Sequence, residues 1–384
     1  MSICTKKEWR EAGVRIDDCV DLARISAEAT IHPGCRVLGS GTSIGPGCEV
    51  GAEAPVLIEN CQLGRNVQLK GGYFSGAVFF EGANMGSGAH VRAGTILEEE
   101  ANGAHTVGFK QTILMPFVTC GSLINLCDVL MAGGTSRKDH SEVGSSYIHF
   151  NFTPHQDKAT ASLIGDVPNG VFLGKRPIFL GGQGGLVGPA RIAYGSVVAA
   201  GGVCREDILG ENQLQVPAVP EAGTRPYETG VYRRTDRIVK NNLAYIGNIL
   251  ALREWYRHVR PLFVRDSFDQ AVLDGGLKNL DLVLKERIKR LGDLAGKLEY
   301  SIQWLEANGG KREEIEVQKR FNSDWPQLKS KIDGLAIPSP GDFLQAMEPK
   351  ESYTESIHSL RSTVKDAGRN WLQEIVDRIE NLWR

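Results

Sequence analysis

The stretch IHPGCRVLGSGTSIGPGCEVG, residues 31–51, places an aliphatic residue at almost every sixth position, with small or turn-forming residues between. This series comprises Ile31, Val37, Ile44, Val50 and Val56, and the spacing returns at Leu186, Ile192 and Val198. Such a period is typical of hexapeptide solenoids, in which each unit is a short strand with one inward side chain. Three units close a triangular coil of about 18 residues, and coils stack about 4.8 Å apart. We therefore predict a left-handed parallel β-helix.

Two regions of the chain differ in composition and in periodicity. Most of the 45 glycines precede residue 230. Beyond about residue 236, apolar residues recur with the 3.6-residue period of helices, as in the stripe that starts at Leu280. We expect an N-terminal cap at 1–28, a β-helical ligand-binding and transferase domain at 29–230, and an α-helical domain at 236–384. The fold class is then mainly β with an α appendage, a C-terminal helical bundle.

The last segment, WLQEIVDRIENLWR at 371–384, places Trp371 and Trp383 along one apolar helix face. Packing of this face against other helices is the preferred interpretation. The alternative is a protein partner that binds through the C-terminal helices.

The overall charge gives no sign of a nucleic-acid or membrane partner. Lys and Arg number 44, Asp and Glu 46, and the net charge is −2, so any anionic ligand needs a local cluster of cations. No apolar run approaches the roughly 20 residues that span a bilayer, and no signal peptide opens the chain. We expect a soluble, cytoplasmic protein that binds neither nucleic acid nor membrane.

A series of charged residues follows the expected coil period. Arg92 and Lys110 are 18 residues apart, and Asp128 is 18 further, so an unbroken coil would stack all three on one edge. Two cations about 5 Å apart repel by roughly 1 kcal/mol even in a water-like dielectric. A bridging phosphate removes that cost, and arginine offers a planar fork suited to phosphate oxygens. The alternative is a solvated edge with both side chains splayed outward.

The segment KDHSEVGSSYIHFNFTPHQDKATASLIGD, 138–166, is rich in chemically active side chains. Its histidines, His140, His149 and His155, are spaced by nine and six residues, which matches no compact ligand motif, and we expect no metal site.

Alternation within YIHFNF, 147–152, predicts which side chains enter the core. The more apolar set, with Ile148 and Phe150, is expected to point inward, and His149 and Asn151 are expected on the opposite side.

Three segments together resemble a known family. They are GSGAHVRAGTILEEEANGAHTVGFKQ at 86–111, CGSLINLCD at 120–128 and YIHFNF. They are similar to the acetyltransferase domain of the bacterial bifunctional UDP-N-acetylglucosamine pyrophosphorylase and glucosamine-1-phosphate N-acetyltransferase, a hexapeptide-repeat transferase. The resemblance covers about 120 residues and implies acetyl-CoA as co-substrate.

The resemblance also implies roles for individual residues. It places ligand-binding cations on Arg92 and Lys110 without a gap, and an Asn-aromatic pair that contacts the sugar on Asn151 and Phe152. In RIAYGSVVAAGGV, 191–203, Ala200 falls on a position that contacts acetyl-CoA.

This chain departs from the family pattern in three ways that concern catalysis. The family's nucleotidyltransferase domain has no counterpart, so we do not expect uridyltransfer. Ser122 replaces the catalytic histidine, and a serine hydroxyl is no base near neutral pH. Asn125 replaces a tyrosine, and we count it among the substrate-binding candidates.

Two loops that exceed the family pattern supply further candidates. The insertion between Asp128 and Glu142 contains SRKDH, so His140 could enter the space beside Ser122 and act as the base. The alternative is a solvated loop histidine. In KRPIFLGGQGGLVGP, Lys175 could meet the phosphates of CoA or could cap a coil with solvated charge.

Three hypotheses remain from the sequence. The leading one is a homotrimeric, acyltransferase-like enzyme that binds a sugar phosphate or a nucleotide sugar such as UDP-N-acetylglucosamine and transfers an acyl group from acyl-CoA, with no tightly bound cofactor. The alternative is a non-catalytic sugar-nucleotide-binding or scaffold protein that has lost its base at Ser122. The third is a structural solenoid without a small-molecule ligand.

Overall fold

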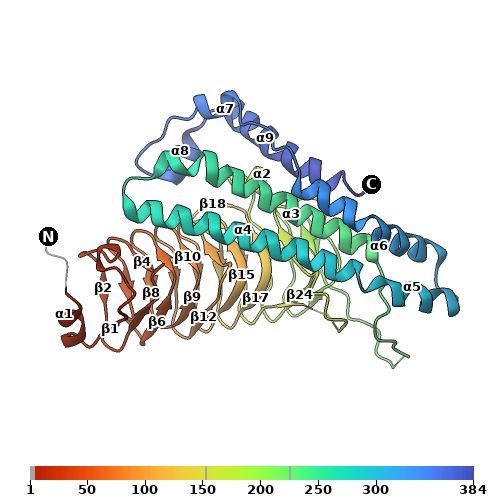
Figure 1. The fold of residues 1–384 in the computed structure, drawn as a ribbon, viewed down its shortest axis with the longest axis horizontal. Helices are drawn as coiled ribbons and strands as arrows, with labels where there is room; N and C mark the ends of the chain where they lie inside the picture. The colour runs from red at the N-terminus through yellow and green to blue at the C-terminus, as the bar shows by residue number, and fades with distance from the viewer. Residues whose placement is uncertain (1–4, 152–153, 225) are drawn as a thin grey trace.

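The first half of the chain is a parallel β-solenoid with three faces (Figure 1). The computed structural model describes residues 5–151, 154–224 and 226–384. Face 1 comprises β1 (Arg15–Ile16), β3 (Arg36–Leu38), β6 (Val56–Glu59), β9 (Gly72–Ser75), β12 (Ala89–Val91), β21 (Ile148–Phe150), β24 (Gly185–Val187) and β27 (Val203–Cys204). Face 2 comprises β4 (Ser43–Ile44), β7 (Gln62–Leu63), β10 (Val78–Phe79), β13 (Ile96–Leu97), β22 (Ser162–Ile164) and β25 (Arg191–Ile192). The parallel β-helix predicted from the six-residue period is confirmed.

Two long strands and a third face complete the coils. The strands β15 (Gly108–Leu114) and β17 (Asn125–Met131) belong to faces 1 and 2 together. Face 3 comprises β2 (Thr30–Ile31), β5 (Glu49–Val50), β8 (Gln68–Leu69), β11 (Asn84–Met85), β14 (Asn102–Gly103), β16 (Thr119–Cys120), β20 (Glu142–Val143), β23 (Phe179–Leu180), β26 (Val197–Val198) and β28 (Leu214–Gln215). A hairpin of β18 (Gly134–Ser136) and β19 (Asp139–His140) leaves the corner between faces 2 and 3.

The six-residue series fills the interior of the solenoid. Val37, Ile44 and Val50 are all fully buried. Cys35 and Cys48 beside them are buried as well, which makes them packing residues.

The coils shorten where β15 and β17 turn from face 1 to face 2. Both strands turn this corner on one residue with positive φ, Gln111 at 47° and Asp128 at 62°. Lys110 therefore pairs with Cys127, which is 17 residues further and not 18. The prediction that Asp128 stacks on Lys110 is wrong, because the single-residue turn removes one residue from the coil and sets Asp128 level with Gln111.

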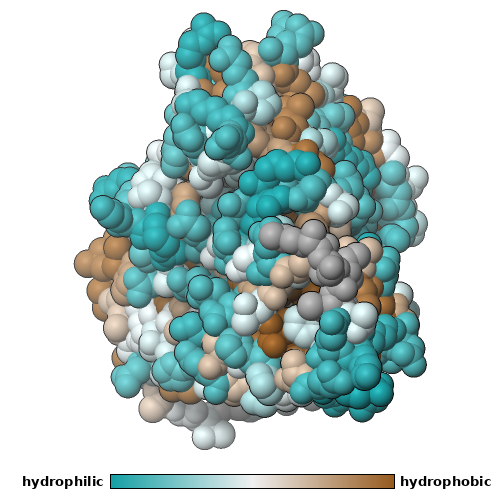
Figure 2. Space-filling view, turned by 90° about the vertical axis from the view of Figure 1, so that its left-hand side faces the viewer, coloured by the Kyte–Doolittle hydropathy of each residue, from teal (hydrophilic) through white to brown (hydrophobic). Residues whose placement is uncertain are grey.

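Helices cap one end of the solenoid and cover one of its sides. The helices are α1 (Lys6–Glu11), η1 (Leu22–Arg24), α2 (Val167–Gly170), α3 (Thr235–His258), η2 (Arg260–Phe263), α4 (Ser267–Ala295), α5 (Leu298–Ala307), α6 (Arg312–Asp333), α7 (Asp342–Gln345), α8 (Tyr353–Ser359) and α9 (Ser362–Glu380). In Figure 1, α3 and α4 run lengthwise beside the solenoid, and α9 lies beyond α3. Seen from its N-terminal end, the molecule is mostly hydrophilic, with separate hydrophobic areas (Figure 2), as expected of a capped solenoid end.

The C-terminal helices form a layer against face 2 and not a free-standing bundle. The outward residues of that face, including Val78, Ile96 and Ile113, are apolar and fully buried. Gly275 of α4 permits the close approach, because a Cβ there would lie 2.2 Å from Gln62 Oε1 and 3.0 Å from Val78 Cγ2. Burial of this apolar surface holds the two halves of the chain together.

The C-terminal tryptophans belong to this packing. Trp371 and Trp383 are 6% and 3% exposed. The Trp371 indole donates to the Pro338 carbonyl at 2.9 Å, and the Trp383 indole donates to Asp236 Oδ1 at 3.0 Å. The alternative of a partner surface on these two side chains is therefore wrong, since both are used inside the fold.

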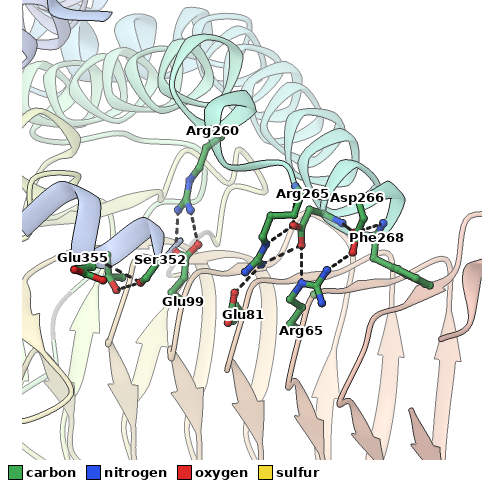
Figure 3. Close-up of polar contacts among 12 residues, drawn as sticks. Arg65, Glu81, Glu99, Arg260, Arg265, Asp266, Phe268, Ser352 and Glu355 are labelled. Carbon is green, nitrogen blue, oxygen red and sulfur yellow. Dashed lines mark hydrogen bonds and ion pairs between the residues drawn. The ribbon is translucent and has the colours of Figure 1, made fainter. Parts of the chain in front are cut away.

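Ion pairs join η2 and the start of α4 to the corner between faces 2 and 3 (Figure 3). Arg260 is 4% exposed; it donates to Glu99 Oε2 at 3.0 Å, and its guanidinium lies 3.6 Å from the centre of the Tyr353 ring. Further along the same edge, Arg265 Nη2 donates to Glu81 Oε2 at 2.8 Å. These contacts fix the helical layer along the length of the solenoid.

A second buried ion pair fastens α4 to the shortened corner. Arg287 of α4 is 2% exposed, and its Nη2 lies 3.0 Å from Asp128 Oδ1 and 2.8 Å from Gln111 Oε1. Its Nη1 donates to the Lys158 carbonyl at 3.4 Å. One guanidinium therefore binds both residues on which the strands turn.

Replacing Arg287 with leucine is expected to lower the free energy of unfolding by about 3–5 kcal/mol, because Asp128 would stay buried without its cation. Denaturant unfolding followed by circular dichroism measures this. The control, Lys329→Ala, removes an ion pair with Asp333 whose side chains are 50% and 49% exposed and should cost less than about 1 kcal/mol. Equal losses for the two variants would contradict a structural role for the buried pair.

Candidate functional site

The end of face 1 carries two neighbouring cations. Val91 pairs with Phe109, and the Arg92 N–H donates to the Phe109 carbonyl at 2.9 Å, so Arg92 lies one coil before Lys110 on the same edge. Within residues 5–151, 154–224 and 226–384, neither side chain has a hydrogen bond or an ion pair. The next position along the edge is Cys127. This edge therefore has positive charge available for an anion.

The middle of face 1 is open beside these cations. Gly108 pairs with His90 on one side and with Asn125 on the other. A Cβ at Gly108 would meet nothing closer than 3.8 Å, where it would approach Asn125 Oδ1. His90 is held by stacking on Tyr73, with ring centroids 4.9 Å apart. Asn125 is exposed on the same outer face as Lys110, two residues from Cys127.

Asn151 closes the cation edge on the next coil. Its Nδ2 donates to Asp128 Oδ2 at 3.1 Å, and Asp128 is in turn held by Arg287. The side chain of Asn151 also hydrogen-bonds Cys127, the position that follows Lys110. Arg92, Lys110 and Asn151 are thus on one edge, as the resemblance implies, and the helical layer fixes the position of Asn151.

The start of face 1 carries an imidazole that the sequence analysis did not identify. His105 Nδ1 lies 2.9 Å from Ser122 Oγ, and the Ser122 N–H donates to Ser145 Oγ at 3.1 Å. His105 is 17 residues before Ser122, and the Leu123 N–H donates to the His105 carbonyl at 3.2 Å, so the two lie on adjacent coils. The coil period was the signal that could have found this pair.

Ala200 lies on the same corner as Ser122, between faces 3 and 1. Ala200 lies two residues after the end of β26. A Cβ at Gly181 would lie 2.3 Å from the Ala200 backbone nitrogen, so the two are on adjacent coils. Gly182 in turn sits against Ser145. Ser122, Ser145, Gly182 and Ala200 therefore form one continuous edge.

His140 and Lys175 lie on a different corner, between faces 2 and 3. His140 ends the hairpin of β18 and β19, and its Nδ1 lies 3.0 Å from the Arg137 carbonyl oxygen. Lys175 Nζ is 2.6 Å from Glu211 Oε1. The expectation that His140 enters the space beside Ser122 is wrong within one chain, because the insertion leaves the corner after face 2 and Ser122 follows face 3.

The strand β21 has the opposite orientation from the one expected. Tyr147 and His149 are buried, whereas Ile148 and Phe150 are 43% and 37% exposed. His149 is held inside by the Cys127 carbonyl at 2.6 Å and by Ser162 Oγ at 2.8 Å. The prediction failed because these two hydrogen bonds satisfy a buried imidazole.

Phe152, expected to contact the sugar, lies outside the described residues. Within the part of the chain that the structure describes, no three His, Cys, Asp or Glu side chains come close enough to hold a metal ion. None of the helices described there is long and apolar enough to cross a membrane.

Comparison with known proteins confirms the resemblance to hexapeptide-repeat transferases. The chain is 28% identical over 205 residues to the bifunctional protein GlmU of Nitratidesulfovibrio vulgaris (strain DP4), which covers 52% of this chain and 40% of that protein. It is 27% identical over 236 residues to GlmU of Clavibacter sepedonicus, covering 56% and 44%. The chain thus spans about two fifths of the length of these relatives. No family model matches the sequence.

A solved structure also shows a likeness. It is the UDP-N-acetylglucosamine acyltransferase of Arabidopsis, with 14% identity over 69% of this chain and 96% of that chain. Its TM-score of 0.21 is too low to support a conclusion about this chain.

The buried His149 predicts a pH dependence of stability. Burial lowers the pKa of His149 to about 4, whereas an unfolded histidine titrates near 6.5. Between these values the unfolded chain binds more protons, so the free energy of unfolding should fall as the pH falls from 6.5 to 4, by up to about 1.4 kcal/mol per unit.

Denaturant unfolding of wild type and His149→Gln at several pH values in this window tests the prediction. The variant should have a shallower slope, and His358→Gln, at an exposed position, should keep the wild-type slope. An unchanged slope for His149→Gln would show that His149 is not held neutral.

Proposed function

We propose that this chain is an acyltransferase that binds a sugar phosphate or nucleotide sugar on face 1 and acylates it from acyl-CoA. The observation that carries the proposal is the pair of cations Arg92 and Lys110, unpaired within the described residues, at the end of a face whose start carries His105 against Ser122. The similarity of half of this chain to GlmU supports it. The anion would bind the two cations, and Asn125 would lie against the sugar.

His105 supplies the base in this proposal. If its Nδ1–H donates to Ser122 Oγ at 2.9 Å, the other ring nitrogen, Nε2, is left as the proton acceptor. Nε2 would take the proton of the attacking amine or hydroxyl as the bond to the acyl carbon forms, and the CoA thiolate would leave. Ser122, which stands at the family's histidine position, would then orient the imidazole one coil earlier.

The span of the site suits a ligand that extends along the face. His105 and Lys110 are five residues apart, and the chain bends at Thr106, where φ is 59°, so their Cα atoms lie closer than the roughly 16 Å of a fully extended segment. Both side chains can lean over the face and shorten this distance. The acyl donor would run along the corner of Gly182 and Ala200, which leads toward His105. Lys175 lies on another corner of the solenoid, so any contact it makes with CoA would be away from the edge of Gly182 and Ala200.

Turnover of glucosamine 1-phosphate, UDP-glucosamine or another amino sugar with acetyl-CoA tests the catalytic assignment. His105→Ala should lower kcat by about 10²–10⁴-fold, which is the usual contribution of a general base. His140→Ala, on the other corner, is the matched control and should keep wild-type kcat. If only the control variant lost activity, the role of base would pass from His105 to His140. Wild-type protein that binds sugar ligands without turnover would favour the non-catalytic binder instead.

Binding of the same sugar ligands is measured by calorimetry. Lys110→Ala should weaken it by about 10- to 100-fold, since a hydrogen bond to a charged group contributes about 1.5–3 kcal/mol. Lys138→Ala, which removes an exposed cation from the hairpin, should have no effect. If wild type binds none of these ligands, the remaining hypothesis is a structural solenoid without a small-molecule ligand.

We also propose that the active form is a trimer in the cytoplasm. Because the helices cover face 2, faces 1 and 3 are left for other copies of the chain. On face 3 the stacked side chains Phe179, Val197 and Leu214 are 40%, 39% and 69% exposed, an apolar column that a second copy would cover. Light scattering of the purified chain should give the mass of three copies, and a monomer at assay concentrations would refute this part.

A further inference from the structure

A large cavity lies between the solenoid and the part of the chain that follows it. Its volume is about 780 Å³, and its walls come from the loop 154–160, the turn at Gly188 and Pro189, the arm 226–233, and Trp304 of α5. None of these elements except the solenoid turn is part of a repeated coil. The cavity is therefore a feature that the chain builds in addition to the β-helix.

The cavity continues the edge that carries the cations. Asn125 pairs with Ile148, so Phe150 is level with Cys127. Phe150 pairs with Val187, and the Gly188 N–H donates to the Phe150 carbonyl at 3.1 Å. From Lys110 to the floor of the cavity there are thus three coil steps, about 14 Å. A ligand whose anion binds Lys110 needs an extension of this length to reach the cavity, and a sugar monophosphate has none.

Aromatic rings form one part of the cavity wall. His155 stacks on Tyr227 with ring centroids 6.2 Å and ring planes 3° apart, and the Tyr232 centroid lies 4.7 Å from that of His155 at a tilt of 57°. The Gly230 N–H donates to His155 Nδ1 at 2.8 Å, and Lys297 Nζ donates to the His155 carbonyl at 2.6 Å. Because these rings are already ordered, a planar ligand can stack on them at little entropic cost.

The cavity wall also carries charged side chains, Asp157, Glu228 and Arg233. Asp157 accepts a hydrogen bond from the Tyr232 hydroxyl, and Glu228 accepts one from the Tyr300 hydroxyl. Arg233 at the wall is exposed, and the described residues offer it no ion pair. The free guanidinium suits a phosphate.

We infer that this cavity binds the nucleobase of a nucleotide sugar whose diphosphate lies on Arg92 and Lys110. The inference rests on the proposed function and chooses between its two substrate classes, naming a nucleotide sugar over a sugar phosphate. The rings take the planar base, and Arg233 at the wall supplies a cation on the side of the α-phosphate, the one nearer the ribose. The adenine of acyl-CoA is the other planar group in the reaction, but its expected edge, at Ala200, is a different corner of the solenoid.

Calorimetry with UDP-N-acetylglucosamine, UDP, glucosamine 1-phosphate and acetyl-CoA tests this. Wild type should bind UDP-N-acetylglucosamine at least 10-fold more tightly than glucosamine 1-phosphate. Trp304→Ala should weaken the two uridine ligands by about 10-fold, as loss of a stacking ring does, and should leave glucosamine 1-phosphate and acetyl-CoA unchanged. Tyr227→Ala, at a side chain 61% exposed, gives the same comparison with little risk to folding.

Failure of the inference can be told from failure of the proposed function. If Lys110→Ala weakens all the sugar ligands and neither cavity variant weakens the uridine ligands, the nucleobase assignment is overturned and the cation edge stands. Weaker acetyl-CoA binding in the cavity variants would assign the cavity to the donor and overturn the inference as well. If wild type binds no sugar ligand at all, both proposals fail.

Discussion

The stacking of one coil on the next is the constraint on which the rest of this structure depends. Backbone hydrogen bonds between parallel strands hold equivalent positions of adjacent coils about 4.8 Å apart. Side chains distant in sequence therefore meet in columns, as Arg92 meets Lys110 and as His105 meets Ser122. A column of like charges is unfavourable unless something neutralises it. Two cations in one column, unpaired within the part of the chain that the structure describes, are for this reason a stronger sign of a ligand than either cation alone.

The three faces of the solenoid are used differently. Face 2 has an apolar outer column, and the C-terminal helices bury it, with Gly275 giving the close contact and Arg287 the ion pair to Asp128. Asp128 also accepts from Asn151. The helical layer thus stabilises the fold and, through one carboxylate, positions a residue of the candidate site. Faces 1 and 3 stay available for ligand and for other copies of the chain.

The candidate residues lie on three different corners of the solenoid. Arg92, Lys110 and Asn151 lie at the end of face 1, and Ser122 and Ala200 at its start, so the resemblance to the transferase family carried over to positions that the coils do bring near one face. His140 and Lys175, which were chosen from inserted loops, lie on the third corner. An inserted loop is not aligned with the repeats of the coils. The corner on which it lies is set by the face whose strand precedes it in the chain, whatever side chains the loop contains.

The sequence by itself determined the solenoid, the helical character of the C-terminal part and the adjacency of Arg92 and Lys110, because all of these follow from local periods of six and 3.6 residues. Only the tertiary structure decided where the helices pack, since any apolar stripe can pack on any apolar face. It also decided that His149 points inward, which depends on hydrogen-bond partners far away in sequence. It decided as well that Cys127, and not Asp128, pairs with Lys110, which depends on the turn conformation at Gln111. The His105 and Ser122 pair lies between these cases: the coil period contains it, but only the stacked coils show that the two side chains touch.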